Sequence, residues 1–246
     1  MGKYYIYNAK LEDKKHKNAT IVFNPDINFD FNTLKNELTE YFRYFHQTSI
    51  LVFLYCKGNK DVQKSVEANL EAIFKSIPKV EESSLSDNIS YIPYDRDSFS
   101  FPKRGFFAKN KKEILNQGLV KIFEDNGGLV ESNGISHHFV FPSGKHSSKF
   151  LRTANVLVFK SQIDFIAINT LHLFSKLDFD NIYCDTLSIN VIAYSMTKYL
   201  KRYNQNKEIN IESFKSYDGL YNSQSTFYDK SIFLISASTS GGLINY

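Results

Sequence analysis

The chain has 246 residues, of which 42% are hydrophobic and 23% charged, and its formal net charge is +4. This composition excludes a disordered or collagen-like chain, and so mild a charge does not favour a nucleic-acid partner. The longest apolar run, Ile50 to Cys56, is far shorter than the roughly 18 to 20 residues that cross a bilayer, so no membrane partner is expected. Two cysteines cannot build a disulfide framework, which agrees with a cytoplasmic, reducing location.

The first hundred residues alternate strand-like and helix-like patterns. Aromatic and β-branched runs predict strands at 4–7, 21–23, 49–55 and 89–94, and helical spacing of apolar residues predicts helices at 31–45 and 61–74. We therefore expect an N-terminal α/β domain over residues 1–104. Its pattern supports a fold class and indicates no function.

Residues 105–246 are expected to form a second α/β domain. A helix is predicted at 106–123 and is expected to stop at Gly127 and Gly128. Four strands are predicted at 138–141, 155–159, 181–184 and 231–235, with helices at 163–177 and 189–203. Strands that alternate with helices predict a parallel sheet with crossover connections.

Two loops follow predicted strands of this sheet, at the edge where α/β proteins bind ligands. One holds Asp185, Thr186, Leu187 and Ser188, and the other is a run of hydroxyls and glycines over 236–242. Backbone N–H groups and hydroxyls in such turns can bind phosphate. The alternative for the first loop is that Asp185 or Ser188 merely caps the following helix.

A third segment, Ser143-Gly144-Lys145-His146-Ser147 after a predicted strand, adds a more specific signal. With the two loops that follow it, this segment resembles the orotate phosphoribosyltransferases, over about residues 105–246. The resemblance implies a type I phosphoribosyltransferase-like parallel sheet flanked by helices. It places a pyrophosphate-binding turn at 185–188, a mobile catalytic loop near 213–219, and the phosphoribosyl-pyrophosphate signature at 236–242.

The resemblance also gives the candidate site residues. Lys215 and Lys145 are the catalytic candidates. The candidates for binding phosphate or nucleotide are Ser143, Gly144, Lys145, Asp185, Thr186, Ser188, Ser236, Ser238, Thr239, Ser240, Gly241 and Gly242.

The sequence departs from the family in two ways. The signature has two adjacent acidic residues that position the ribose, and this chain has Ser236 and Ala237 there. Transfer at an anomeric carbon depends on ribose positioning and charge neutralisation, so most of the catalysis should be lost while phosphate binding persists. The family sheet also continues with a helix and another strand, whereas this chain stops at Tyr246. The chain is then a fragment, a partner completes the fold, or the site is vestigial.

Three functions remain open. The first is a catalytically degenerate sensor or adaptor that binds phosphoribosyl pyrophosphate or a nucleotide; by resemblance, such proteins belong to bacterial regulatory or defence operons. The second is an active transferase for a pyrimidine-like base, with magnesium as cofactor held by Asp185 or Asp218. The third is a scaffold for other protein chains, which the 22 Phe and 16 Tyr favour slightly. No protein-ligated metal site is expected, because adjacent histidines on a strand point to opposite faces.

Overall fold

The computed structural model describes residues 2–59, 61–75, 77, 88–96, 98, 100–133, 138–140, 144–174, 177–203, 208–214 and 227–236. The chain divides into two compact units, which are described separately. Unit 1 comprises residues 1–120 and 159–175, and unit 2 comprises residues 121–158 and 176–246. Unit 1 therefore extends past residue 104, where the sequence predicts the boundary between two domains. The division into domains 1–104 and 105–246 stays a prediction. None of the described helices is long and apolar enough to cross a membrane.

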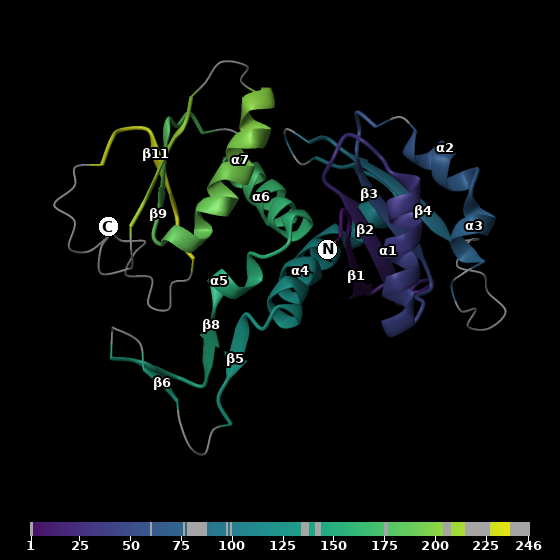
Figure 1. Ribbon diagram of the computed structural model, residues 1–246, viewed down its shortest axis with the longest axis horizontal. Helices are drawn as coiled ribbons and strands as arrows, with labels where there is room; N and C mark the ends of the chain where they lie inside the picture. The colour runs from purple at the N-terminus through teal and green to yellow at the C-terminus, as the bar shows by residue number, and fades with distance from the viewer. Residues whose placement is uncertain are drawn as a thin grey trace. The chain divides into compact units, whose positions relative to one another are not determined.

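Unit 1 is a four-stranded sheet with helices on both faces. Its strands lie in the order β1-β2-β3-β4, with β1 antiparallel to β2 and the other pairs parallel. Helices α1 to α3 connect the parallel strands, and α4 and α6 complete the unit (Figure 1). The elements are β1 (Tyr5–Lys10), β2 (Asn18–Asn24), α1 (Phe31–Tyr44), β3 (Leu51–Cys56), α2 (Val62–Glu67), α3 (Leu70–Phe74), β4 (Ile89–Tyr94), α4 (Phe106–Asp125) and α6 (Lys160–Phe174).

The two faces of this sheet carry separate packing. Side chains alternate along each strand, so neighbouring residues contact different helices. Val22 and Phe53 pack with buried residues of α1, α2 and α3, such as Leu38. On the other face, Phe23 contacts Phe165 of α6, with ring centroids 5.0 Å apart. The sheet of unit 1 is therefore covered by helices on both faces.

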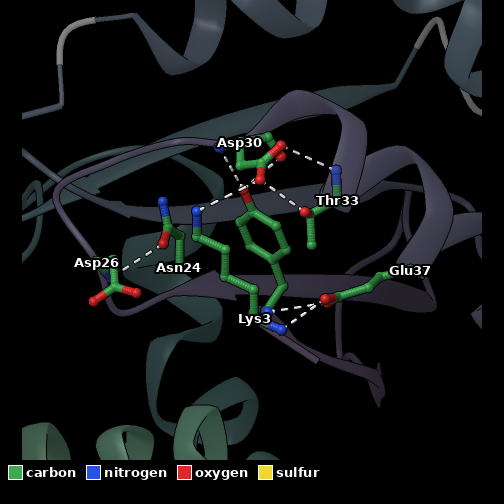
Figure 2. A network of polar contacts seen from close by, with 7 residues as sticks. Lys3, Asn24, Asp26, Asp30, Thr33 and Glu37 are labelled. Atoms are coloured by element: carbon green, nitrogen blue, oxygen red, sulfur yellow. Dashed lines mark hydrogen bonds and ion pairs between the residues drawn. The ribbon is translucent and has the colours of Figure 1, made fainter. Parts of the chain in front are cut away.

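The start of the chain is fastened to α1 by a polar network (Figure 2). The Glu37 carboxylate accepts the backbone N–H groups of Lys3 at 2.6 Å and Tyr4 at 3.0 Å. The Tyr4 hydroxyl donates to the Asp30 carbonyl, and the Asp30 side chain caps α1 by accepting from the Thr33 N–H. Each of these polar groups is hydrogen-bonded to another group of the fold. We therefore assign the network a structural role.

The helix predicted over 61–74 is wrong as one element, because it is broken into α2 and α3. The backbone leaves helical geometry at Asn69, where φ is −128°. The Asn69 side chain donates to the Ser65 carbonyl at 2.8 Å. Asparagine competes in this way with the hydrogen bonds of a helix, and the break follows from that competition.

Unit 2 contains a three-stranded parallel sheet and two short hairpin-like pairs. The sheet has the order β10-β9-β11, with β9 in the centre. The pairs are β5 with β8 and β6 with β7, both antiparallel. The elements are β5 (Leu129–Glu131), β6 (Phe139–Val140), β7 (His146–Ser147), β8 (Lys149–Leu151), α5 (Thr153–Val156), β9 (Asn181–Cys184), the 3-10 turn η2 (Leu187–Ile189), α7 (Asn190–Tyr203), β10 (Asn210–Ser213) and β11 (Ser231–Leu234).

The parallel sheet confirms part of the sequence prediction. The strands predicted at 181–184 and 231–235 are β9 and β11, and α7 crosses from β9 to β10 (Figure 1). The strand predicted at 138–141 is described only as β6, in an antiparallel pair rather than in the parallel sheet. The structure thus has the α/β class and a parallel sheet, without showing the complete type I arrangement.

The strand predicted at 155–159 is wrong. Residues 153–156 form the short helix α5, and Leu157 to Phe159 follow in a loop. Val156 is fully buried, whereas Val158 is 54% exposed. A short apolar run does not distinguish a strand from a buried helical turn, and here only one of its side chains reaches the core.

Candidate phosphate-binding edge of unit 2

The carboxyl ends of the three parallel strands meet at one edge of the unit 2 sheet. The Asp185 N–H donates to the Leu234 carbonyl at 3.0 Å, and the Phe214 N–H donates to the Cys184 carbonyl at 3.1 Å. The chain segments after β9, β10 and β11 therefore leave the sheet side by side. These are the segments that the sequence singles out as candidate ligand loops, and parallel sheets bind ligands at this edge.

Asp185 and Ser236 are joined across this edge. The Asp185 Oδ2 atom accepts the backbone N–H of Ser236 at 3.0 Å and its hydroxyl at 2.8 Å. Asp185 is only 2% exposed, and its Oδ1 atom is buried with no hydrogen-bond partner among the described residues. One carboxylate oxygen thus ties the loop after β9 to the loop after β11. The other oxygen is not held by any residue that the structure describes.

The contacts of Asp185 decide against the capping alternative for this residue. Its carboxylate accepts from Ser236, which follows the neighbouring strand β11, and Thr186, at the N-cap of η2, makes no side-chain capping bond. The Thr186 and Ser188 hydroxyls lie 2.9 Å apart, and either can be the donor. Both residues are only partly buried, and the hydroxyl that accepts in this pair keeps its own proton for an incoming acceptor.

Burial and, to a smaller extent, the adjacent Asp185 carboxylate raise the pKa of the Cys184 thiol to about 12. Cys184 is completely buried at the end of β9. The thiol therefore stays protonated at neutral pH and acts as a small apolar side chain rather than as a nucleophile.

Thr153 is a member of this edge that the sequence analysis missed. Its hydroxyl donates to the Ser236 carbonyl at 3.1 Å, so the first residue of α5 holds the segment after β11. The sequence predicts a strand that begins at Asn155, two residues further on, and the hydroxyl of Thr153 itself carries no signal. The signal that could have identified Thr153 is its position after Arg152, at the start of a helical turn.

The predicted site residues from the Ser-Gly-Lys-His-Ser segment are only partly described. Gly144 has a positive φ of 74°, which favours glycine, and it lies in the loop between β6 and β7 with Lys145. Lys145 is exposed, and its reach toward a ligand remains a prediction. The candidates outside the described residues are Ser143, Lys215, Ser238, Thr239, Ser240, Gly241 and Gly242.

The histidines of this region form a stacked pair. The rings of His138, just before β6, and His146, on the paired strand β7, have centroids 4.4 Å apart. Across the described parts of the chain, no group of three or more His, Cys, Asp or Glu side chains is arranged to hold a metal ion.

Comparison with known proteins gives one consistent relationship. Orotate phosphoribosyltransferases of Thermotoga petrophila, Thermotoga neapolitana and Thermotoga maritima are each 28% identical to this chain over 83 residues. The chain is a partial relative of these enzymes. The match covers 34% of the chain and 42% of each relative, so the chain spans less than half the length of the curated relatives it matches. No family model matches the chain, and no solved structure matches it significantly.

Proposed function

We propose that the chain is a phosphoribosyltransferase-like protein that binds a phosphorylated sugar or a nucleotide, such as phosphoribosyl pyrophosphate, at the edge formed by Asp185 and Ser236. The observation that carries the proposal is the pair of hydrogen bonds from Ser236 to Asp185, because it joins two loops that the family uses for the ligand. The partial similarity to orotate phosphoribosyltransferases supports the same ligand class.

In this proposal the phosphates contact the protein directly through hydrogen-bond donors, and the Asp185 carboxylate contributes only through magnesium. Thr186 and Ser188 supply hydroxyls at the edge, and Lys145 supplies a positive charge from the loop between β6 and β7. The hydroxyls and backbone N–H groups of the segment 238–242 complete the phosphate contacts. Such donor-rich turns at the ends of parallel strands bind anions without further charge.

The site suits a sensor or adaptor better than an ordinary transferase. Ser236 stands where the family signature has an acidic residue, and its hydroxyl is engaged with Asp185. A hydroxyl in that position cannot neutralise the charge that develops on the ribose during transfer. The resemblance supports a role of this kind in a bacterial regulatory or defence system.

Magnesium is the cofactor that the family relationship implies, and Asp185 fits it in one respect. The buried Oδ1 atom has no hydrogen-bond partner within the described residues, and magnesium is often held by one or two carboxylates together with substrate phosphates. One carboxylate alone is too few protein ligands to hold a magnesium ion. We therefore propose that Asp185 is the residue that would hold a magnesium ion bound together with the ligand, and that such an ion would supply positive charge to the phosphates.

The Asp185 Oδ1 atom also favours a second candidate function. This is an active transferase in which Asp185 replaces the missing acids of the signature. The two functions differ in turnover and not in binding. Both retain Asp185 as the residue that faces the ligand.

The test is a calorimetric titration of the full chain with phosphoribosyl pyrophosphate and a panel of nucleotides, with and without magnesium, followed by a pyrophosphate-release assay with a panel of bases. Binding without release supports the sensor, and release establishes the transferase. Thr239→Trp and Ser240→Trp each place bulk in the phosphate loop and should abolish binding. Unchanged affinity in both variants, or absence of binding in the parent chain, would leave the scaffold function.

A further inference from the structure

Two buried asparagines in unit 1 each have an amide nitrogen with no hydrogen-bond partner among the described residues. Asn24 is the last residue of β2 and is 3% exposed, and Asn59 follows the end of β3 and is 7% exposed. The Nδ2 atom is the unsatisfied atom in both side chains. Buried polar groups are normally hydrogen-bonded, so two such atoms in one region require an explanation.

The orientation of both amides is fixed by the backbone. The Asp26 N–H donates to the Asn24 Oδ1 atom at 3.0 Å, and the Asp61 N–H donates to the Asn59 Oδ1 atom at 3.3 Å. Figure 2 shows the first of these bonds, with the amide nitrogen of Asn24 on the other side of the group. Exchanging oxygen and nitrogen would place an NH2 group against a backbone N–H. The donors that remain are therefore the nitrogens.

Both asparagines lie at the same edge of the unit 1 sheet. Asn24 pairs with Tyr55 in the parallel ladder between β2 and β3. The chain turns after β3, where the Asn59 N–H donates to the Cys56 carbonyl at 2.8 Å, so Asn59 stays close to the end of that strand. This is the carboxyl edge of three parallel strands, the position where open α/β sheets bind ligands.

Charges of both signs lie near this edge. Arg96 follows β4, the third parallel strand; it is 6% exposed and carries a permanent positive charge. Asp26 lies 3.6 Å from the Lys160 ammonium, and the Asp95 carboxylate accepts from the backbone N–H and hydroxyl of Ser98. Two of the acids near this edge are thus engaged within the fold, and the third, Asp61, is exposed to solvent. The protons for an anion come from the two asparagine nitrogens.

We propose that the carboxyl edge of the unit 1 sheet binds a small oxyanion, a phosphate or carboxylate group, whose oxygens accept hydrogen bonds from the Asn24 and Asn59 Nδ2 atoms. This site lies in the other unit from Asp185 and does not depend on the function proposed above. The sequence indicates no role for residues 1–104. In this proposal they bind a ligand separate from that of unit 2.

The direct test follows the asparagine side-chain signals of the full chain by 1H–15N nuclear magnetic resonance. The signals are assigned through bonds from the backbone, and the protein is titrated with inorganic phosphate in one arm and acetate in the other. In at least one arm, the Asn24 and Asn59 signals should shift together and saturate with one dissociation constant. A response to phosphate alone, to acetate alone, or to both identifies the class of oxyanion.

Asn24→Asp and Asn59→Asp sharpen the test. Each variant keeps the oxygen that binds the backbone and replaces the donor with a negatively charged acceptor, so each should weaken anion binding at least tenfold. Asn8→Asp, on β1 and paired with Thr20 rather than with the carboxyl edge, is the matched control and should keep the parent affinity. Parent signals that do not move in either arm would overturn the proposal and assign the two nitrogens to buried water. Equal affinities of the two variants and the control would overturn it as well.

Discussion

Asp185 is the central residue of the candidate site, and its two carboxylate oxygens have different environments. One accepts two hydrogen bonds from Ser236, and the other is buried without a partner among the described residues. The sequence could place both residues at the carboxyl edge, because each directly follows a strand-like run. It could not show that they bind each other, because that contact depends on β9 and β11 being neighbours in the sheet. Thr153 was missed for the same reason.

An acid at position 236 should be incompatible with Asp185. Ser236→Asp would place a second carboxylate against Oδ2, and two like charges at this distance cannot both remain ionised without cost. We expect a loss of about 1 to 3 kcal/mol in the free energy of unfolding. The double variant Asp185→Ser with Ser236→Asp, which moves the acid to the other loop, should recover most of that loss.

Urea unfolding of the parent, the two single variants and the double variant measures this coupling as a double-mutant cycle. If the losses in the single variants simply add in the double variant, the two side chains do not interact as described.

Cys184 should be inert in the folded protein. Its pKa, raised to about 12 by burial and by Asp185, exceeds that of an unfolded thiol near 9. The thiol therefore contributes stability that is present below about pH 9 and is lost as the pH rises toward 12. In a Cys56→Ala background, a thiol reagent at pH 8 should label Cys184 about 100-fold or more slowly in the native protein than in urea. Similar rates in both states would show that the thiol is accessible.

At the scale of elements, the sequence predicted strongly periodic segments well and short ones poorly. The helices α1, α4 and α7 and the strands β3 and β9 lie where apolar spacing placed them, because each buries a continuous face. The strand β4 was also predicted, although most of its residues are only partly buried. The edge strand β10 was not predicted, since its four residues are only partly buried or exposed. The break between α2 and α3 depends on one asparagine side chain, which periodicity does not register.

Gly118 should be required for the packing of α4 on β1. A Cβ atom there would lie 2.7 Å from the Tyr7 ring and 2.8 Å from the Phe165 ring, and the Gly118 carbonyl accepts from the Tyr5 hydroxyl at 2.6 Å. Alanine gains about 1 kcal/mol of helix propensity, but overpacking a tight core costs about 1 to 3 kcal/mol. We expect Gly118→Ala to lower the free energy of unfolding.

Thermal and urea unfolding of Gly118→Ala can be compared with Val120→Ala, a change on the exposed side of the same helix. The control should stay within about 0.5 kcal/mol of the parent. A more stable Gly118→Ala protein would mean that propensity outweighs packing at this position.

At the scale of the whole molecule, the alternation of strands and helices predicted an α/β protein with a parallel sheet, and the structure confirms this. The division of the chain is less simple than the sequence suggests. Helix α4 extends across the limit of unit 1 at residue 120, and α6 belongs to unit 1 although it follows the β5 to β8 segments of unit 2. Local sequence patterns cannot show which sheet a helix covers, because that choice depends on residues far away in the chain.

The most direct test of the central claim is a calorimetric titration of phosphoribosyl pyrophosphate with magnesium into three proteins: the parent, Asp185→Asn and Asp178→Asn. The two variants carry the same substitution at opposite ends of β9, and Asp178 forms an exposed ion pair with Lys230. The account predicts binding by the parent and by Asp178→Asn, with affinity at least about tenfold weaker in Asp185→Asn, since that variant removes the charge that holds the metal. Equal affinities in the two variants, or no binding by the parent, would contradict it.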